Sequence, residues 1–110
     1  MKLPNSENAI IDEQKLVGYC LNPNHSDGQH KARVFKSALD LSIENLDELK
    51  SALLEAVQQY DAVPEKRNSY GQKYCIDFAM THKRKTAIIH SVWIVRDNEA
   101  FPRLVTYYVI

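Results

Sequence analysis

The chain has 110 residues, of which 45% are hydrophobic, and a formal net charge of zero. This length suits one domain with one core and is too short for two, so we expect residues 1–110 to form a single domain. The neutral total argues against a protein that coats nucleic acid through bulk charge. Charge is nevertheless divided unevenly: residues 1–60 hold six Lys and Arg against nine Asp and Glu, and residues 61–110 hold eight against five. A local basic site is therefore permitted in the second half.

No segment of the sequence predicts export or membrane insertion. The first eight residues lack the apolar core of a signal peptide, and no later run approaches the ~18–20 apolar residues of a membrane span. We therefore expect a cytoplasmic protein with no membrane partner. In that compartment Cys20 and Cys75, far apart in sequence, are expected to be buried thiols rather than a disulfide.

The first half of the chain has the 3.6-residue period of helices. Three helices are expected, over residues 13–20, 30–39 and 46–60. The third is the clearest, because Asp47 and Glu48 occupy its first turn, where carboxylates interact favourably with the helix dipole. Ser42 or Asn45 supplies its cap.

After Tyr60 the period changes to two, and β-branched and aromatic residues become frequent. Four strands are expected, over residues 62–67, 74–80, 86–96 and 103–110. Pro64 suits only an edge strand, and the polar run 82–85 predicts a hairpin turn. Residues 86–96 are apolar on both faces, which favours a central strand. The predicted architecture is α+β, with N-terminal helices packed on a C-terminal antiparallel sheet of about four strands.

Two cationic residues, His30 and Lys31, stand where the second helix begins. Cations are unfavourable there, each forgoing roughly 0.3–1 kcal/mol relative to a carboxylate, so their presence suggests an anion-binding site. A solvated basic helix start is the plainer interpretation. The spacing of Cys20, His25 and His30 suggests a zinc site. The sequence offers no fourth ligand nearby, so no metal or other cofactor is expected. Three glycines also leave little material for a phosphate-binding loop.

A second candidate group lies on the central strand, where His90 and Arg96 share one face. Thr106 or Tyr108 of the last strand is expected to lie beside them in either register. Asp77, on the neighbouring strand, is a candidate partner for one of these cations. The alternatives stay open: a lone strand histidine is often an ordinary hydrogen-bonded residue, and a strand carboxylate is often only solvated.

These residues supply what metal-independent RNA cleavage requires: a base for the 2′-OH, an acid for the leaving oxygen, and cations for the phosphorane charge. His30 is a candidate base, because the helix start disfavours its protonation. Lys31, His90 and Arg96 are candidate phosphate contacts, and Thr106 is a candidate hydrogen-bond donor. Such a set also occurs by chance in many domains of this size.

Several short strings spread over nearly the whole chain resemble a bacterial family of unknown function. They include Leu3-Pro4-Asn5, Leu21-Asn22-Pro23, His30-Lys31-Ala32-Arg33-Val34-Phe35, Tyr70-Gly71, Ile76-Asp77-Phe78, Trp93-Ile94-Val95-Arg96 and Pro102-Arg103-Leu104. Members of that family occur as short standalone proteins and as carboxy-terminal tips of polymorphic toxins, beside genes that look like antitoxins or immunity proteins. The layout is similar to that of the barnase, EndoU and RelE ribonucleases, although fold alone does not fix function.

The resemblance carries over residue by residue. The matching positions are the His30-Lys31 pair, Asp77, Trp93, Arg96, Arg103 and, at a Ser/Thr position, Thr106. The chain departs from the pattern at His90, where the resemblance implies an arginine, and a histidine lacks the fixed guanidinium fork. Asp77, Arg103 and Tyr108 are then expected to contact substrate.

The sequence therefore predicts a metal-independent endoribonuclease toxin of a toxin-antitoxin or toxin-immunity pair, with RNA as substrate and a cognate antitoxin or immunity protein as partner. The alternative is a non-catalytic interaction module that pairs with a neighbouring gene product through a sheet edge or the acidic third helix.

Overall fold

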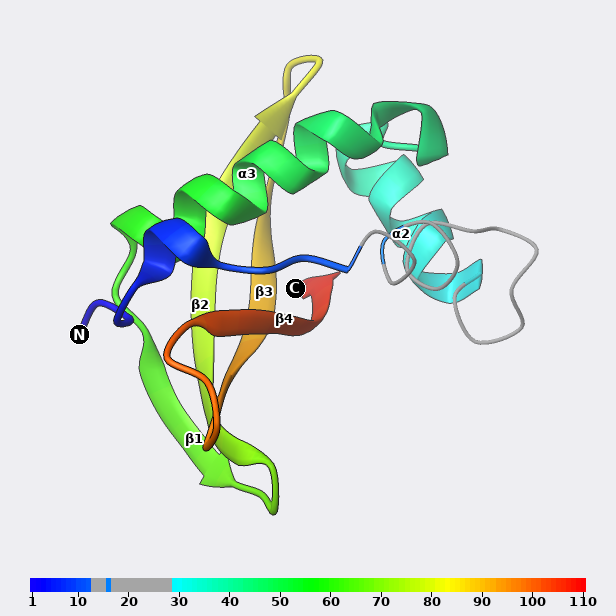
Figure 1. Cartoon of the computed structure of the whole chain (residues 1–110). Coiled ribbons are helices and arrows are strands. Elements are labelled where there is room, and N and C mark those ends of the chain that lie inside the picture. The colour runs from blue at the N-terminus through cyan, green and yellow to red at the C-terminus, as the bar shows by residue number, and fades with distance from the viewer. Residues whose placement is uncertain (13–15, 17–28) are drawn as a thin grey trace.

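The computed structural model describes residues 1–12, 16 and 29–110. Two helices precede four strands, with short 3-10 turns at Ser6–Asn8 and Ile43–Asn45. The elements are α2 (Gln29–Leu39), α3 (Leu46–Gln59), β1 (Val63–Arg67), β2 (Gly71–His82), β3 (Lys85–Arg96) and β4 (Pro102–Val109). This confirms the predicted α+β layout of N-terminal helices followed by a four-stranded sheet (Figure 1).

The strands form an antiparallel meander in the order β1-β2-β3-β4, so β3 is central, as its apolar sequence predicts. The β2–β3 hairpin turns through two residues, Lys83 and Arg84, which adopt φ values of 48° and 70°. Two consecutive positive φ values match the right-handed twist of the flanking strands, which is why so short a loop closes here. Outside the four strands, Ile10 pairs in parallel with Arg103 at the outer edge of β4.

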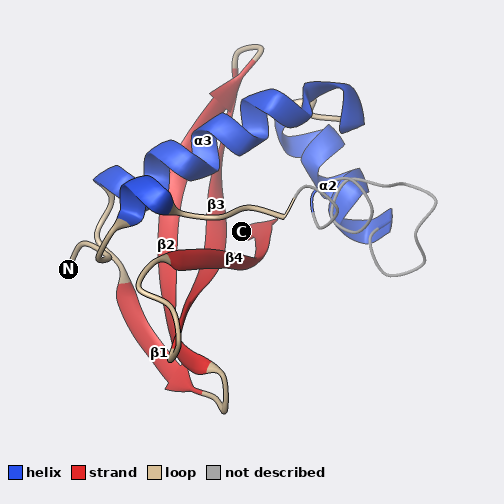
Figure 2. Ribbon diagram, viewed as in Figure 1, coloured by secondary structure: helices blue, strands red, loops and turns tan. Residues whose placement is uncertain are grey.

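Helices α2 and α3 pack against one face of the sheet, and Figure 2 shows this two-layer arrangement. The core lies between the layers and is centred on Trp93 and Tyr107, both fully buried. The ring of Phe35 on α2 meets Tyr107 edge-to-face, with centroids 5.3 Å apart. From α3, Leu49 and Leu53 are fully buried. Burial of each such side chain contributes about 1.5–3 kcal/mol, so this interface holds the helices on the sheet.

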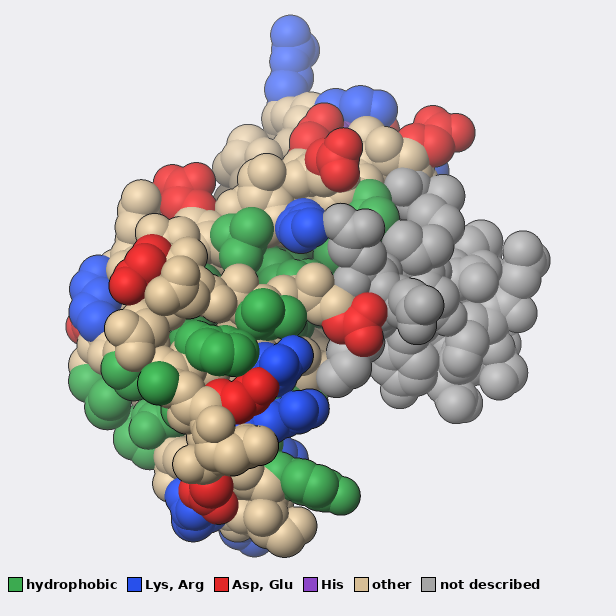
Figure 3. Space-filling model, in the orientation of Figure 1, with side chains coloured by type: hydrophobic (Ala, Val, Ile, Leu, Met, Phe, Trp, Pro, Cys, Tyr) green, Lys and Arg blue, Asp and Glu red, His purple; other side chains and the backbone are tan. Residues whose placement is uncertain are grey.

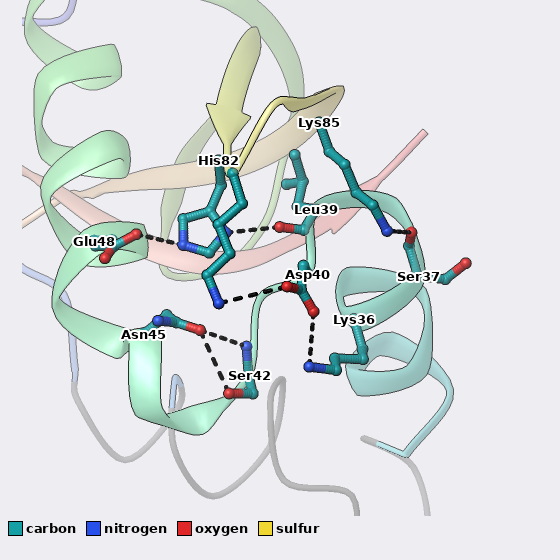
Figure 4. Close-up of polar contacts among 10 residues, drawn as sticks. Lys36, Ser37, Leu39, Asp40, Ser42, Asn45, Glu48, His82 and Lys85 are labelled. Carbon is teal, nitrogen blue, oxygen red and sulfur yellow. Dashed lines mark hydrogen bonds and ion pairs between the residues drawn. The ribbon is translucent and has the colours of Figure 1, made fainter.

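A buried histidine joins the two helices to the tip of the β2–β3 hairpin (Figure 4). The Nδ1 atom of His82 lies 2.7 Å from the carbonyl oxygen of Leu39, at the end of α2. Its Nε2 atom lies 2.7 Å from a carboxylate oxygen of Glu48, in the first turn of α3. Lys85 adds a hydrogen bond from its ammonium to the carbonyl oxygen of Ser37, at 3.1 Å. His82 therefore serves the packing of the domain.

The sequence predicts most element bounds to within a few residues. The strand expected over residues 74–80 extends at both ends to Gly71–His82, and the weak strand expected over 62–67 is the exposed edge strand β1. The helix expected over residues 13–20 lies outside the described residues, apart from Leu16, which is buried. None of the described helices combines the length and apolar character that crossing a membrane requires.

Candidate functional site

The candidate site residues of the strands lie on the face of the sheet opposite the helices, which we call the distal face. Alternation along β3 directs Ile89, Ser91 and Trp93 to the helices and His90 to the distal face. Asp77 and Tyr108 also lie on the distal face, because His90 is the cross-strand partner of both. The expectation that one of the two last-strand residues lies beside His90 is confirmed for Tyr108.

His90 is held from three directions, and we call its surroundings the His90 cluster: Glu65, Cys75, Asp77, His90 and Tyr108. The Nδ1 atom lies 2.5 Å from the Oδ1 atom of Asp77. The Nε2 atom lies 3.5 Å from the sulfur of Cys75. The imidazole also stacks at a tilt on the Tyr108 ring, with centroids 4.9 Å apart. The side chain of His90 is 18% exposed and that of Asp77 is 53% exposed, so the pair sits at the surface.

The thiol of Cys75 is strongly biased toward its protonated form. Burial, a hydrogen bond with Glu65 and the negative charges of Glu65 and Asp77 raise its pKa to about 12. The expectation of a buried thiol is confirmed for Cys75, but its place beside a histidine was not foreseen.

A second group of candidate residues forms a basic recess of about 280 Å³ farther along the distal face. Its cations are Lys73, Arg96 and Arg103, and we use the name basic recess for the space they line. Arg103 donates from Nε and Nη2 to the two carboxylate oxygens of Glu99, at 2.7 and 2.6 Å. This pairing holds the pKa of Glu99 below its ordinary value. Figure 3 shows Lys and Arg side chains gathered beside an acidic one around a hollow below β4.

The close approach of two strands shapes one end of the basic recess. Gly71 is paired with Arg96, and a Cβ atom at position 71 would lie 2.2 Å from the carbonyl oxygen of Val95. Glycine is therefore needed here for β2 to approach β3. The close approach of the two strands therefore fixes the position of Arg96 at the end of β3.

The two groups share a face but do not share one pocket. His90 and Arg96 are six residue steps apart along β3, and at about 3.3 Å per step their Cα atoms lie about 20 Å apart. His90 and Arg96 therefore share a face, as expected, but lie too far apart to contact one phosphate. Thr106 is paired with Val92, between the two groups.

The first-half candidates, His30 and Lys31, lie in the first turns of α2. Their side chains are outside the described part of the structure, so their roles stay predictions. Helix α2 belongs to the layer that packs on the face opposite His90. The helix that carries His30 and Lys31 therefore lies on the other side of the sheet from His90. The Cys20, His25 and His30 spacing also depends on residues outside the described ones.

A third feature is a groove on the helical side, which we call the acidic groove. It has a volume of about 520 Å³ and carries Asp47, Glu48 and Glu55 of α3 opposite Phe78 and Met80 of β2. The sequence anticipates the acidic character of α3 but not the groove. Cys75, Glu65 and Lys73 are also residues that sequence reasoning missed. The alternation of β2, which aligns Lys73 and Cys75 with Asp77, could have found those two residues, whereas Glu65 lies on β1.

The chain belongs to the family described as a domain of unknown function, DUF6883, and the model of that family matches residues 2–110. No curated protein matches the chain. Among solved structures, the fold is similar to that of a chain in a contact-dependent growth inhibition toxin-immunity protein complex from Klebsiella pneumoniae 342. The TM-score is 0.69 at 14% identity, over 94% of this chain and 95% of that one. At this identity the likeness concerns the fold.

Proposed function

We propose that this protein is a metal-independent endoribonuclease that acts as the toxin of a toxin-antitoxin or toxin-immunity pair. The observation that carries the proposal is the His90 cluster on the distal face, with the cations of the basic recess beyond it. The similarity in fold to a chain of a toxin-immunity complex supports a toxin-type role with a cognate partner. It does not distinguish the toxin from its immunity protein.

In the proposed reaction the 2′-hydroxyl of RNA attacks the adjacent phosphate, a base removes its proton, and an acid protonates the leaving 5′-oxygen. His90 is suited to contact the phosphate, because Asp77 accepts a hydrogen bond from Nδ1 and so fixes the orientation of the imidazole ring. Thr106 is assigned as a hydrogen-bond donor to substrate and Tyr108 as a substrate contact. His30 and Lys31 stay the base and phosphate contact that the sequence predicts, and because α2 packs on the other face of the sheet they are not assigned to the phosphate that His90 contacts.

The basic recess is assigned to flanking phosphates rather than to the scissile one. Arg96 lies too far along β3 from His90 to share its phosphate, and an extended RNA strand crossing the distal face would meet both groups. Lys73 and Arg96 are the better ligands for this purpose. Arg103 already donates two hydrogen bonds to Glu99, so its charge is partly compensated.

The test is growth on induced expression, comparing wild type with His90→Ala and His30→Ala, together with electrophoresis of total RNA. We expect wild type to arrest growth and produce RNA fragments, and each variant to relieve both. Lys50→Ala, on α3, is the matched control and should remain toxic. Arrest without RNA fragments, or full toxicity in both histidine variants, would overturn the proposal.

The second candidate is a non-catalytic interaction module, and two described features favour it. The acidic groove offers carboxylates beside apolar side chains, and β1 leaves one edge of the sheet exposed. Charge reversal separates the two candidates. A partner that blocks an RNA site should bind less tightly after Arg103→Glu, whereas a partner of the helical side should be more sensitive to Lys50→Glu.

A further inference from the structure

Three potential metal ligands from three neighbouring strands converge within the His90 cluster. They are a carboxylate oxygen of Glu65 on β1, the sulfur of Cys75 on β2 and a ring nitrogen of His90 on β3. These atoms all lie within 4.8 Å of one another. Such convergence requires the β1–β2 and β2–β3 registers together, since the three residues are far apart in the sequence.

A carboxylate orients the histidine in the way that metal sites require. Asp77 accepts a hydrogen bond from Nδ1 of His90, at 2.5 Å, which leaves Nε2 directed toward the sulfur of Cys75, at 3.5 Å. A ligating histidine almost always has such a partner on its other nitrogen, which fixes the tautomer and raises the basicity of the ligand.

We propose that Glu65, Cys75 and His90 bind a zinc ion, with Asp77 orienting the imidazole. Thiolate, imidazole and carboxylate together match the preference of Zn²⁺, which takes these three donor types in tetrahedral sites. Three protein ligands leave a fourth position for water or a ligand oxygen. The assignment goes beyond the proposed ribonuclease activity and does not depend on it.

The same residues also resemble a Cys-His-Asp arrangement for nucleophilic catalysis, but the thiol is unsuited to that role. A reactive cysteine has a lowered pKa and an electropositive setting. Cys75 is instead buried beside the carboxylate of Glu65. A divalent cation suits this setting, because a thiol that coordinates a metal loses its proton and the Glu65 carboxylate supplies a second anionic ligand.

Zinc binding has a consequence for the proposed nuclease. Because Nδ1 of His90 is engaged by Asp77, an RNA phosphate would have to bind at Nε2, in place of its contact with the sulfur of Cys75. A zinc ion on Nε2 therefore withdraws His90 from substrate. Zinc is expected to inhibit cleavage, as a regulator of the site rather than a cofactor of the reaction.

The experiment is a titration of the reduced full-length protein with Co²⁺ as a spectroscopic probe, followed by displacement with Zn²⁺. We expect one equivalent to bind with a thiolate-to-cobalt absorption band. Cys75→Ser should abolish the band, and Cys20→Ser, the matched control, should keep it. Asp77→Asn should keep the band but weaken affinity by about 10–100-fold. His90→Gln provides a second ligand variant, and circular dichroism checks that each variant is folded.

Two results would overturn the assignment. One is the absence of saturable binding by wild type. The other is a band that survives Cys75→Ser and disappears with Cys20→Ser, which would move the metal to the Cys20, His25 and His30 spacing. Neither readout requires nuclease activity, so failure of the proposed function leaves this test intact.

Discussion

The basic recess should contribute the salt-dependent part of RNA binding, and a double substitution measures it. Lys73 and Arg96 are the cations to remove, because the Arg96 side chain is 48% exposed and its Nε lies 3.9 Å from Glu99, too long for a hydrogen bond. Each phosphate contact on a single strand contributes about 0.7 to the slope of log affinity against log salt. Loss of two contacts should therefore lower the slope by about 1.4.

This slope predicts a measurable difference over an ordinary salt range. Between about 0.05 and 0.2 M salt, wild type should lose about sevenfold more affinity than the Lys73→Ala, Arg96→Ala variant. Fluorescence anisotropy with a labelled single-stranded RNA measures both slopes. Lys2→Ala with Lys50→Ala removes the same charge from elsewhere on the protein and should leave the slope unchanged. Equal slopes for wild type and the recess variant, or equal losses in the two double variants, would refute the assignment.

Three further outcomes are expected. Ser91→Ala should lower the free energy of unfolding in urea by about 1–3 kcal/mol, because buried Ser91 accepts a hydrogen bond from the Trp93 indole and the substitution leaves that donor unpaired. A loss below about 1 kcal/mol would contradict this. RNA cleavage should persist in EDTA, and loss of activity restored by zinc or magnesium would reverse the metal-independent assignment. Because Arg103 lowers the pKa of folded Glu99, its carboxylate stabilises the protein above the ordinary value of 4.5 and does so less as pH falls. The difference in Tm between wild type and Glu99→Gln should therefore shrink below that pH, and a constant difference would refute the pairing.

The fold was predictable to the extent that periodicity determines it. Helical spacing predicts α3 and alternation predicts β2, because each buries a regular stripe of side chains. The pairing of Ile10 with Arg103 was not predictable, since a bridge at one residue leaves no period in the sequence. The extension of β2 to Gly71 was also missed, because the polar Gln72 and Lys73 interrupt the apolar alternation that marked the strand.

The site was predictable in part, and the limits have physical causes. Alternation places His90 with Tyr108 and Asp77, because cross-strand partners share a face. Glu65 joins them only through the pairing of β1 with β2, whose register shifts between Pro64 and Arg67. Sequence alone does not locate such an irregularity. The separation of His90 from Arg96 was overlooked because sharing a face was taken as sharing a pocket.

The core residues and the strand residues proposed to act occupy opposite faces of one sheet. Trp93 and Tyr107 anchor the helices, whereas Asp77 and His90 form a surface pair outside that interface. Neither side chain packs against the helices, so substitution at either one leaves that interface intact. A defect in binding or cleavage after substitution at Asp77 or His90 therefore reports on the site itself. Substitution of a core residue such as Trp93 or Tyr107 would instead unfold the domain, so a loss of function in such a variant would say nothing about the site.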